Sequence, residues 1–234
     1  MGYCLLYEAM LDSVIWARDH YLKHDGLMVP SHCTLKIAPL SDPEYIDEHV
    51  HFWKSVYGFD MSGMSHDIYD DAMVQQVPSK AIVADAPSLL TSFLTLPLKT
   101  MTVDELSFEG KPFAFRLNAD IESLDGFVVW FDTFFLTTPH DQLPALIRAE
   151  DFVRKEGDKI AFTTGPFGKD THWHQGVLLI KYHGKQPQAL RKGQDIEGMI
   201  GYNKRRDDGR ALDINVSWRL AGGNTRGKQT WSMR

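Results

Sequence analysis

Apolar residues near the start of the chain recur at intervals of three and four residues from Met10 to Leu22, with charged residues between them. This spacing predicts an amphipathic helix that ends at Gly26. The next apolar run, Leu27-Met28-Val29, is closed by Pro30 and predicts a short strand. A helix followed by a strand is typical of a fragment of an α/β sheet.

A second helical pattern begins at Ser41-Asp42-Pro43-Glu44, which is a strong helix start because it carries a proline in the first turn. An apolar stripe then runs as far as Gly58 and consists of Ile46, Val50, Trp53 and Tyr57. Residues 59–77 continue with a looser pattern that is rich in Met and Asp. Together these segments predict a helical hairpin.

The remaining segments read as strands separated by Gly and Pro turns. The expected strands are Thr34–Ala38, Lys80–Asp85, Ser88–Leu96, Phe113–Leu117, Gly126–Leu136, Trp173–Tyr182, Ile196–Tyr202 and Asp213–Leu220. Many short strands with such turns predict a mainly β fold, either a barrel or a sandwich.

The composition of the 234 residues, with 43% apolar and 24% charged side chains, is that of a globular domain. A net charge of −6 argues against a general nucleic-acid binder. No apolar run reaches the roughly 18 residues of a membrane span, and the start has no basic leader, so we expect no membrane segment and no secretion. Because Cys4 and Cys33 cannot form a disulfide framework, a cytoplasmic or nuclear location is expected.

Candidate chemistry is sparse when residues are taken one at a time. The chain has no G-x-G-x-x-G or G-x-x-x-x-G-K loop and no G-x-S-x-G nucleophile. His172 and His174 would face the same way on a strand, but no Glu follows to complete a cupin-type site, so no metal is expected. Glu8, at the start of a helix, is by itself most simply a solvated carboxylate.

Four segments, in order, change that interpretation. Residues 1–19, Met-Gly-Tyr-x-Leu-x-Tyr-Glu-x-Met-Leu-Asp-Ser-Val-x-x-Ala-Arg-Asp, resemble the second half of the double-glutamate loop of protein arginine methyltransferases. Residues 26–31, Gly-Leu-Met-Val-Pro-Ser, resemble the strand that leads to the family's domain-joining proline. Residues 53–62 are similar to the family's dimerisation arm, and Thr171-His172-Trp173-His174-Gln175 resembles its Thr-His-Trp loop. The loop resembles the asymmetric-dimethylating class, and the closest likeness is to the branch with an N-terminal zinc finger.

The resemblance implies an architecture. It divides the chain into a helix–strand remnant of the S-adenosylmethionine-binding, Rossmann-type domain (1–29), a β-barrel that binds substrate (30–41 and 78–234) and a helical dimerisation arm (42–77). The arm would bind the partner subunit in a homodimer. The resemblance also implies a cis peptide bond between Val29 and Pro30.

The resemblance also assigns roles to individual residues. Glu8 matches the second glutamate, which holds the substrate guanidinium, and His172 matches a proton relay or orienting residue. Trp173 would wall the arginine channel. Met10 matches a residue that packs on the adenosine of S-adenosylmethionine, and Met1 matches one that crowds the reacting nitrogens. No metal role is implied.

The substrate would be an arginine in a protein, and the chain would act as the barrel portion of the enzyme. The chain lacks the Gly-rich loop and the first glutamate of the family, so we expect it to neither bind S-adenosylmethionine tightly nor methylate arginine alone. The alternative is a non-enzymatic β-barrel module whose acidic arm binds basic protein partners.

Overall fold

A computed structural model describes residues 2–155, 160–184, 186–221 and 226–234. Its strands are β1 His32–Leu40, β2 Met73–Gln75, β3 Leu94–Pro97, β4 Phe108–Arg116, β5 Gly126–Phe135, β6 Ile160–Thr163, β7 Gln175–Leu179, β8 Asp195–Lys204, β9 Leu212–Leu220 and β10 Arg226–Met233. The α-helices are α1 Met10–Tyr21, α2 Pro43–His49, α3 Ala86–Leu90 and α4 Ala149–Lys155. Short 3₁₀ turns are η1 Tyr3–Leu5, η2 Tyr7–Ala9, η3 His51–Lys54, η4 Ser62–Ser65, η5 Ser79–Ala81 and η6 Asp104–Leu106.

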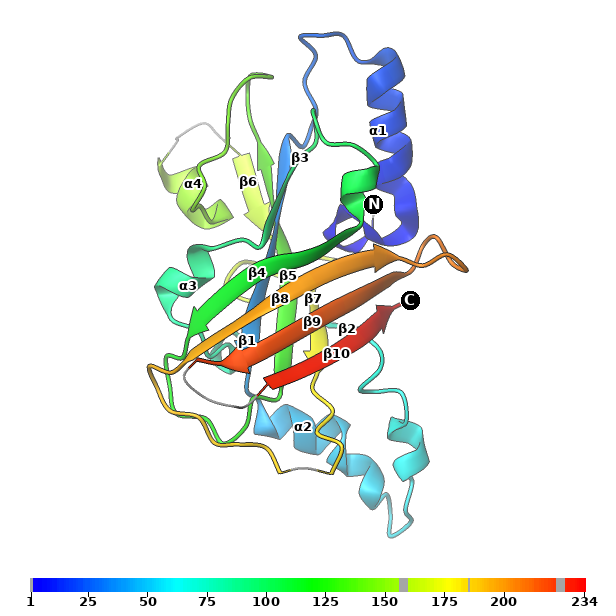
Figure 1. The fold of residues 1–234 in the computed structure, drawn as a ribbon, viewed down its shortest axis with the longest axis vertical. Helices are drawn as coiled ribbons and strands as arrows, with labels where there is room; N and C mark the ends of the chain where they lie inside the picture. Colours follow the sequence, from blue (N-terminus) through cyan, green and yellow to red (C-terminus); the bar gives the residue numbers. More distant parts are fainter. Residues whose placement is uncertain (1, 156–159, 185, 222–225) are drawn as a thin grey trace.

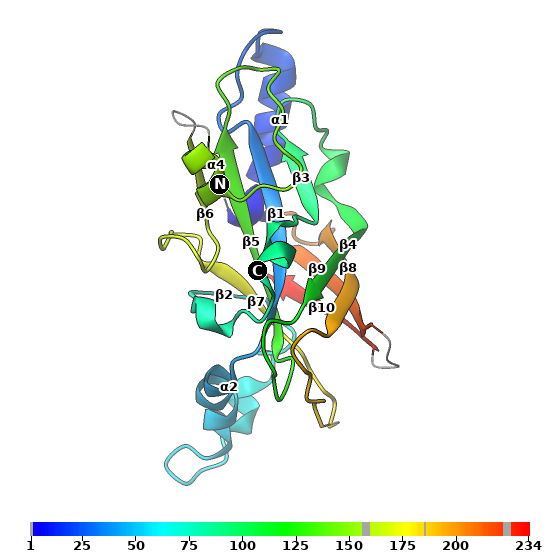
Figure 2. The same cartoon turned by 90° about the vertical axis from the view of Figure 1, so that its left-hand side faces the viewer.

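The described strands form two antiparallel sheets and do not close into one hydrogen-bonded barrel. One sheet has the order β2-β7-β5-β1-β3, with β6 also paired to β5, and the other has the order β10-β9-β8-β4. The two sheets face each other, as the two views in Figure 1 and Figure 2 show. The expectation of a mainly β fold is therefore confirmed, while the closed barrel is corrected to two sheets.

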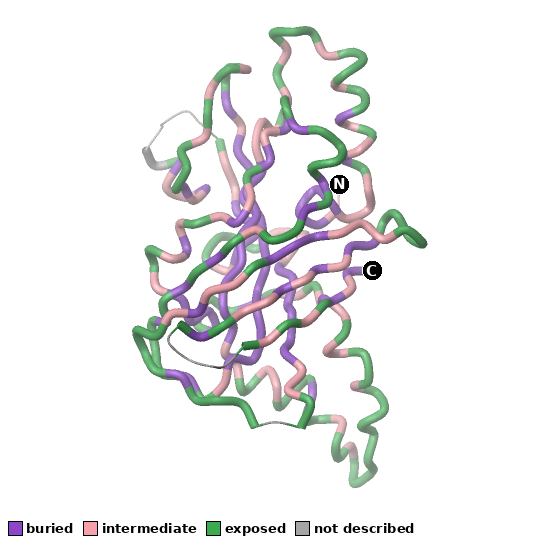
Figure 3. The backbone as a smooth tube through the Cα atoms, viewed as in Figure 1, coloured by how far each residue is buried: buried purple, intermediate pink, exposed green. Residues whose placement is uncertain are grey.

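The core lies between the sheets and is rich in aromatic side chains. Phe127 of β5 meets Phe113 of β4 at a centroid distance of 5.8 Å and Trp218 of β9 at 5.3 Å. The strands at the centre of the molecule are buried, whereas both ends of its long axis are largely exposed (Figure 3). Alternation along β9, where Leu212, Ile214 and Val216 are buried, gives the four-stranded sheet one apolar face.

The N-terminal helix α1 and the arm, residues 42–77, extend from opposite ends of the molecule (Figures 1 and 2). The predicted helix near residue 10 is present as α1, but only Leu11 and Ile15 of its apolar stripe are buried. Residues 27–29 do not form the predicted strand. The Val29–Pro30 peptide bond is cis, as the resemblance implies.

The arm differs from the predicted helical hairpin. Its helix α2 starts where expected, with the Asp42 carboxylate accepting a hydrogen bond from the Tyr45 N–H, but it ends at His49. The second predicted helix is replaced by the 3₁₀ turn Ser62–Ser65 and strand β2. Among the described residues, no helix is long and apolar enough to cross a lipid bilayer.

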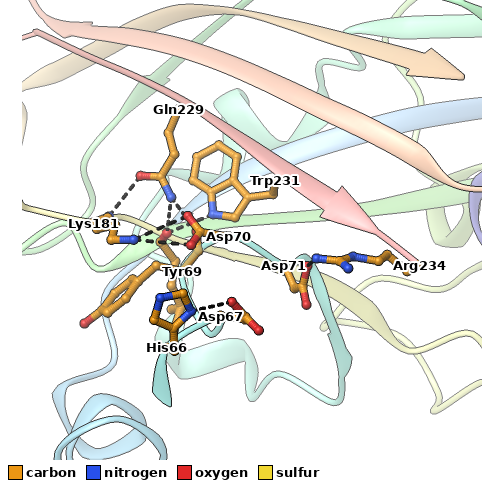
Figure 4. A network of polar contacts seen from close by, with 10 residues as sticks. His66, Asp67, Tyr69, Asp70, Asp71, Lys181, Gln229, Trp231 and Arg234 are labelled. Atoms are coloured by element: carbon orange, nitrogen blue, oxygen red, sulfur yellow. Dashed lines mark hydrogen bonds and ion pairs between the residues drawn. The ribbon is translucent and has the colours of Figure 1, made fainter. Parts of the chain in front are cut away.

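A network of polar contacts attaches the arm to the sheets (Figure 4). The side chain of Gln229 in β10 accepts a hydrogen bond from the Lys181 N–H at 2.9 Å and donates to the carbonyls of Tyr69 and Leu179 at 2.7 and 2.9 Å. Lys181 also pairs with Asp70 at 3.3 Å. At the end of the chain, Arg234 pairs with Asp71 at 2.9 Å. These contacts hold the end of the arm against β7 and β10.

Candidate functional site

Glu8 lies in a loop, residues 2–9, that has an unusual backbone. Cys4, Leu5, Glu8 and Ala9 all have positive φ values, between 55° and 71°. Each such left-handed conformation costs a residue with a Cβ atom about 1–2 kcal/mol. Strain of this kind persists only where the surrounding structure enforces it, and it gathers at functional sites.

Tyr3 anchors this loop to the six-stranded sheet. Its hydroxyl donates a hydrogen bond to the carbonyl of Val129 in β5 and accepts one from the Gly176 N–H in β7 at 3.0 Å. A Cβ atom at residue 176 would lie 2.8 Å from the Val129 side chain, so glycine avoids crowding between β7 and β5 at this position. The side chains of residues 3–6 are all buried, and their burial offsets the strain of the loop.

His172 and Trp173 lie in a turn that precedes β7. The turn is closed by a hydrogen bond from the His174 N–H to the Thr171 carbonyl at 3.2 Å. Gln175 fixes its end, since this buried amide accepts from the Val77 N–H at 2.7 Å and donates to the Thr164 carbonyl at 2.5 Å. The His172 side chain is exposed and makes no hydrogen bond to any other described residue, so its imidazole is open to a group from elsewhere.

Phe131 of β5 connects the two loops. Its ring meets Tyr3 edge-on at a centroid distance of 5.9 Å and Trp173 edge-on at 5.7 Å. Trp173 also stacks on Phe162 of β6 at 5.8 Å. The Glu8 loop and the Thr-His-Trp turn are therefore packed against the same strands, and Trp173 supports the Glu8 loop indirectly, through Phe131.

Met10 is the first residue of α1 and follows the Glu8 loop directly. Its side chain is 48% exposed, and an exposed thioether can pack on an aromatic ring such as adenine. Its exposure leaves the thioether accessible to a ligand beside the Glu8 loop. Met1 lies outside the described residues.

His172 and His174 do not have the geometry that two ligands of one metal ion would need. The predicted strand begins only at Gln175, and His174 has a φ of 50° inside the turn, so the strand argument for two rings on one face does not apply. In the described parts of the chain, no three His, Cys, Asp or Glu side chains gather closely enough to hold a metal ion.

A groove of about 850 Å³ lies elsewhere, on the four-stranded sheet. Its lining includes Pro112, Ala114, Met199 and Ser217, and none of the predicted site residues lines it. Its position away from both loops separates it from the candidate site.

Three residues that support the site had no role predicted from the sequence. Tyr3 belongs to the motif of residues 1–19 but was given no function, Phe131 has the pattern of an ordinary core aromatic, and Arg210 lies 202 positions after Glu8. Arg210 nevertheless forms an ion pair with the Glu8 carboxylate at 2.9 Å. Contacts across such separations follow from the fold alone, so spacing arguments could not find them.

The fold and the two loops define a mainly β protein built from two antiparallel sheets. Residues 31–223 match the arginine methyltransferase oligomerization subdomain, and the chain belongs to this family. It is 37% identical over 223 residues to the ribosomal protein arginine N-methyltransferase rmt3 of Schizosaccharomyces pombe, covering 95% of this chain and 37% of that protein. It is 30% identical to protein arginine N-methyltransferase 1 of Saccharomyces cerevisiae, covering 98% of this chain and 60% of the relative.

Solved structures agree with this membership. The Trypanosoma brucei PRMT1 enzyme-prozyme heterotetrameric complex with AdoHcy matches with a TM-score of 0.79 at 26% identity, covering 100% of this chain and 66% of that one. Arabidopsis thaliana protein arginine methyltransferase 10 matches with a TM-score of 0.71 at 25% identity, covering 100% of this chain and 68% of the neighbour. The chain therefore spans between about a third and two thirds of the length of these relatives.

Proposed function

We propose that this chain forms the substrate-binding portion of a protein arginine methyltransferase that uses S-adenosylmethionine. The observation that carries the proposal is the packing of the Glu8 loop and the Thr-His-Trp turn against the same strands through Tyr3 and Phe131. The names of the relatives support it, and they favour it over a non-enzymatic module that binds basic partners.

Glu8 would hold the arginine substrate. A guanidinium is cationic and delocalised, so its nitrogens are poor nucleophiles until a carboxylate draws the positive charge to one side. Bound S-adenosylmethionine would supply the methyl group and leave as S-adenosylhomocysteine, while the proton lost from the guanidinium nitrogen would pass to a base or to water. The Glu8 carboxylate would orient the attacking nitrogen and stabilise the charge that remains on the guanidinium.

Three further residues would complete this chain's share of the site. The exposed imidazole of His172 is available to receive or orient a proton, because histidine changes its charge near neutral pH. Trp173 would form a wall of the arginine channel, and Met10 would pack on the adenosine. Met1, outside the described residues, keeps its proposed place beside the reacting nitrogens. The first glutamate of the family's pair and the remaining cofactor contacts would come from the S-adenosylmethionine-binding domain, of which residues 1–29 would be the last part.

The arm would mediate assembly as a homodimer. The family is described as an oligomerization subdomain, which supports association in general. Apolar side chains project from the arm into solvent: Phe52, Tyr57, Phe59, Met61 and Met64. Exposed apolar side chains concentrated on one projecting element are typical of a protein interface. The domain limits at residues 30, 42 and 78, the zinc-finger branch and a cytoplasmic or nuclear location remain predictions.

A fusion protein tests the enzymatic proposal. The segment that precedes the matched region in the Schizosaccharomyces pombe relative is joined to residue 1 of this chain, so that Met1 is kept, and methyl transfer to an arginine-rich peptide is measured. We expect activity in the fusion, loss of about 100-fold or more on Glu8→Gln, and no tight binding of S-adenosylmethionine by the 234-residue chain in calorimetry. A matched control is Glu197→Gln, a partly exposed carboxylate that also pairs with an arginine.

Two results would contradict the proposal. If Glu8→Gln retains the activity of the unsubstituted fusion, the carboxylate does not hold the substrate. If the 234-residue chain alone binds S-adenosylmethionine at micromolar concentration, the cofactor site is not completed by another domain.

A further inference from the structure

The residue that contacts the Glu8 carboxylate comes from the turn between β8 and β9. Arg210 holds Glu8 at two points: its Nη2 donates to Oε1 at 2.9 Å, and its carbonyl accepts a hydrogen bond from the Glu8 N–H at 2.9 Å. The first contact fixes the side chain, and the second fixes the backbone of a residue that has a φ of 71°.

The turn that carries Arg210 is itself well defined. The Asp208 carboxylate accepts a hydrogen bond from the Arg210 N–H at 3.0 Å, and the Asp208 carbonyl accepts one from Ala211 at 3.1 Å. At the base of the same hairpin, Lys204 pairs with Asp12 of α1 at 2.5 Å. Two ion pairs therefore join this hairpin to the N-terminal segment, one on each side of Met10.

We propose that Arg210 is a positioning residue for Glu8, a role that rests on the proposed function. The pair leaves the second carboxylate oxygen, Oε2, without a hydrogen bond to any described residue. With Oε1 held, the carboxylate plane cannot rotate freely, and Oε2 stays directed toward a second donor. A substrate guanidinium supplies such a donor, so Arg210 prepares the orientation that the reaction needs.

A second arginine of the same strand pair provides a matched control. Arg219 pairs with Glu197 at 2.8 Å, and the side chains are 70% and 42% exposed, compared with 69% and 32% for Arg210 and Glu8. The two pairs have the same chemistry and similar exposure. Only the first one involves a residue of the candidate site.

The kinetic test uses the fusion protein described above. We expect Arg210→Met to lower kcat by about 10- to 100-fold, while the KM for S-adenosylmethionine and the unfolding temperature stay unchanged. Arg210→Lys should recover part of the loss because it keeps a cation beside Glu8, and Arg219→Met should leave kcat unchanged. Equal kcat values for Arg210→Met and Arg219→Met would overturn the proposal. A rise in kcat would also overturn it, since Arg210 would then compete with the substrate for Glu8.

A measurement that does not depend on activity separates this inference from the proposed function. In the 234-residue chain, Arg210→Met should speed amide hydrogen exchange at Glu8 by about two- to five-fold, the range expected for an exposed ion pair, and Arg219→Met should not. Unchanged exchange at Glu8 overturns the positioning role whatever the activity. Faster exchange together with an inactive unsubstituted fusion protein would leave the positioning of Glu8 supported and the enzymatic proposal refuted.

Discussion

The two sheets and the arm are stabilised in different ways. The sheets enclose a continuous aromatic and aliphatic core, in which Trp231, Phe127 and Phe131 are fully buried. The arm has few buried side chains and exposes Tyr57 almost completely. Its end is attached by the pairing of β2 with β7, by backbone hydrogen bonds between residues 70–72 and Ser232, and by the hydrogen bond from Gln229 to the Tyr69 carbonyl. The sheets thus hold their shape by burial of a core, whereas the position of the arm depends on backbone pairing and hydrogen bonds at one end.

The largest expected effect is in the sheets. Trp231 is fully buried, and its Nε1 donates to the Leu179 carbonyl at 2.8 Å. Trp231→Ala should lower the free energy of unfolding by about 3–5 kcal/mol, measured by urea denaturation, because it leaves a large cavity and removes one of the two hydrogen bonds to the Leu179 carbonyl. Trp16→Ala, a change at a half-exposed tryptophan of α1, is the matched control. Comparable losses at the two sites would contradict the contrast between buried core and exposed ends.

The second effect concerns a carboxyl group inside the sheets. Burial raises the pKa of Asp132 to about 6. The nearby cation of Lys36 opposes this increase, and the carboxylate of Glu150 adds to it. Such a group stabilises the fold in its protonated form, so the stabilisation is complete below pH 3.8 and is lost as the pH rises through about 6. A shift of this size corresponds to about 3 kcal/mol.

Asp132→Asn should therefore gain stability relative to the unsubstituted chain between pH 4.5 and pH 7, as measured by urea denaturation at both values. Asp60→Asn in the arm is the control. Hydrogen bonds from Ser62 lower the pKa of the Asp60 carboxyl, which stays ionised throughout this range and should give no such trend. A pH-independent difference for Asp132→Asn would show that the carboxyl is already ionised in the fold at pH 4.5.

The third effect concerns the attachment of the arm to the sheets, which we expect to weaken when the side chain of Gln229 is changed. Gln229→Leu removes three hydrogen bonds and should cost about 1–3 kcal/mol. Limited proteolysis should then cut residues 60–72 faster, while exchange in β8 and β9 stays slow. Thr230→Val, at an exposed neighbour in β10 whose hydroxyl donates to Asn215 of β9 rather than to the arm, should not speed proteolysis of the arm. Unchanged proteolysis of the arm in Gln229→Leu would mean that Gln229 does not hold it.

The smallest effect on stability is expected at Tyr57, which is 97% exposed. Tyr57→Ser should change the free energy of unfolding by less than about 0.5 kcal/mol. If the arm mediates dimerisation, the same change should weaken self-association of the fusion protein in sedimentation experiments. If the Tyr57→Ser fusion protein self-associates as strongly as the unsubstituted fusion protein, Tyr57 does not lie in the interface.

Much of the sheet structure could be predicted from the sequence. The strands near residues 34–38, 113–117, 126–136, 196–202 and 213–220 are all present, because alternating or continuous apolar runs bury one or both faces. The predicted strand over 80–85 is reduced to isolated bridges at Ile82 and Ala84, because η5 covers residues 80–81. The predicted strand over 88–96 is present only from Leu94 onward, as β3, because α3 covers residues 88–90. The mainly polar segment 226–233 did not predict β10, which pairs with β9 along its whole length.

The candidate site shows the same division. Glu8, Met10, His172 and Trp173 were identifiable from local motifs, because a resemblance of this kind is carried by residues that are neighbours in sequence. The sequence alone also determined the mainly β character and the start of α2, since periodicity and capping are local properties. Only the tertiary structure decided that the strands form two sheets, that Phe131 connects the two loops, and that Arg210 pairs with Glu8. These contacts join residues up to 202 positions apart, and their energies depend on which strands pair, which no local pattern encodes.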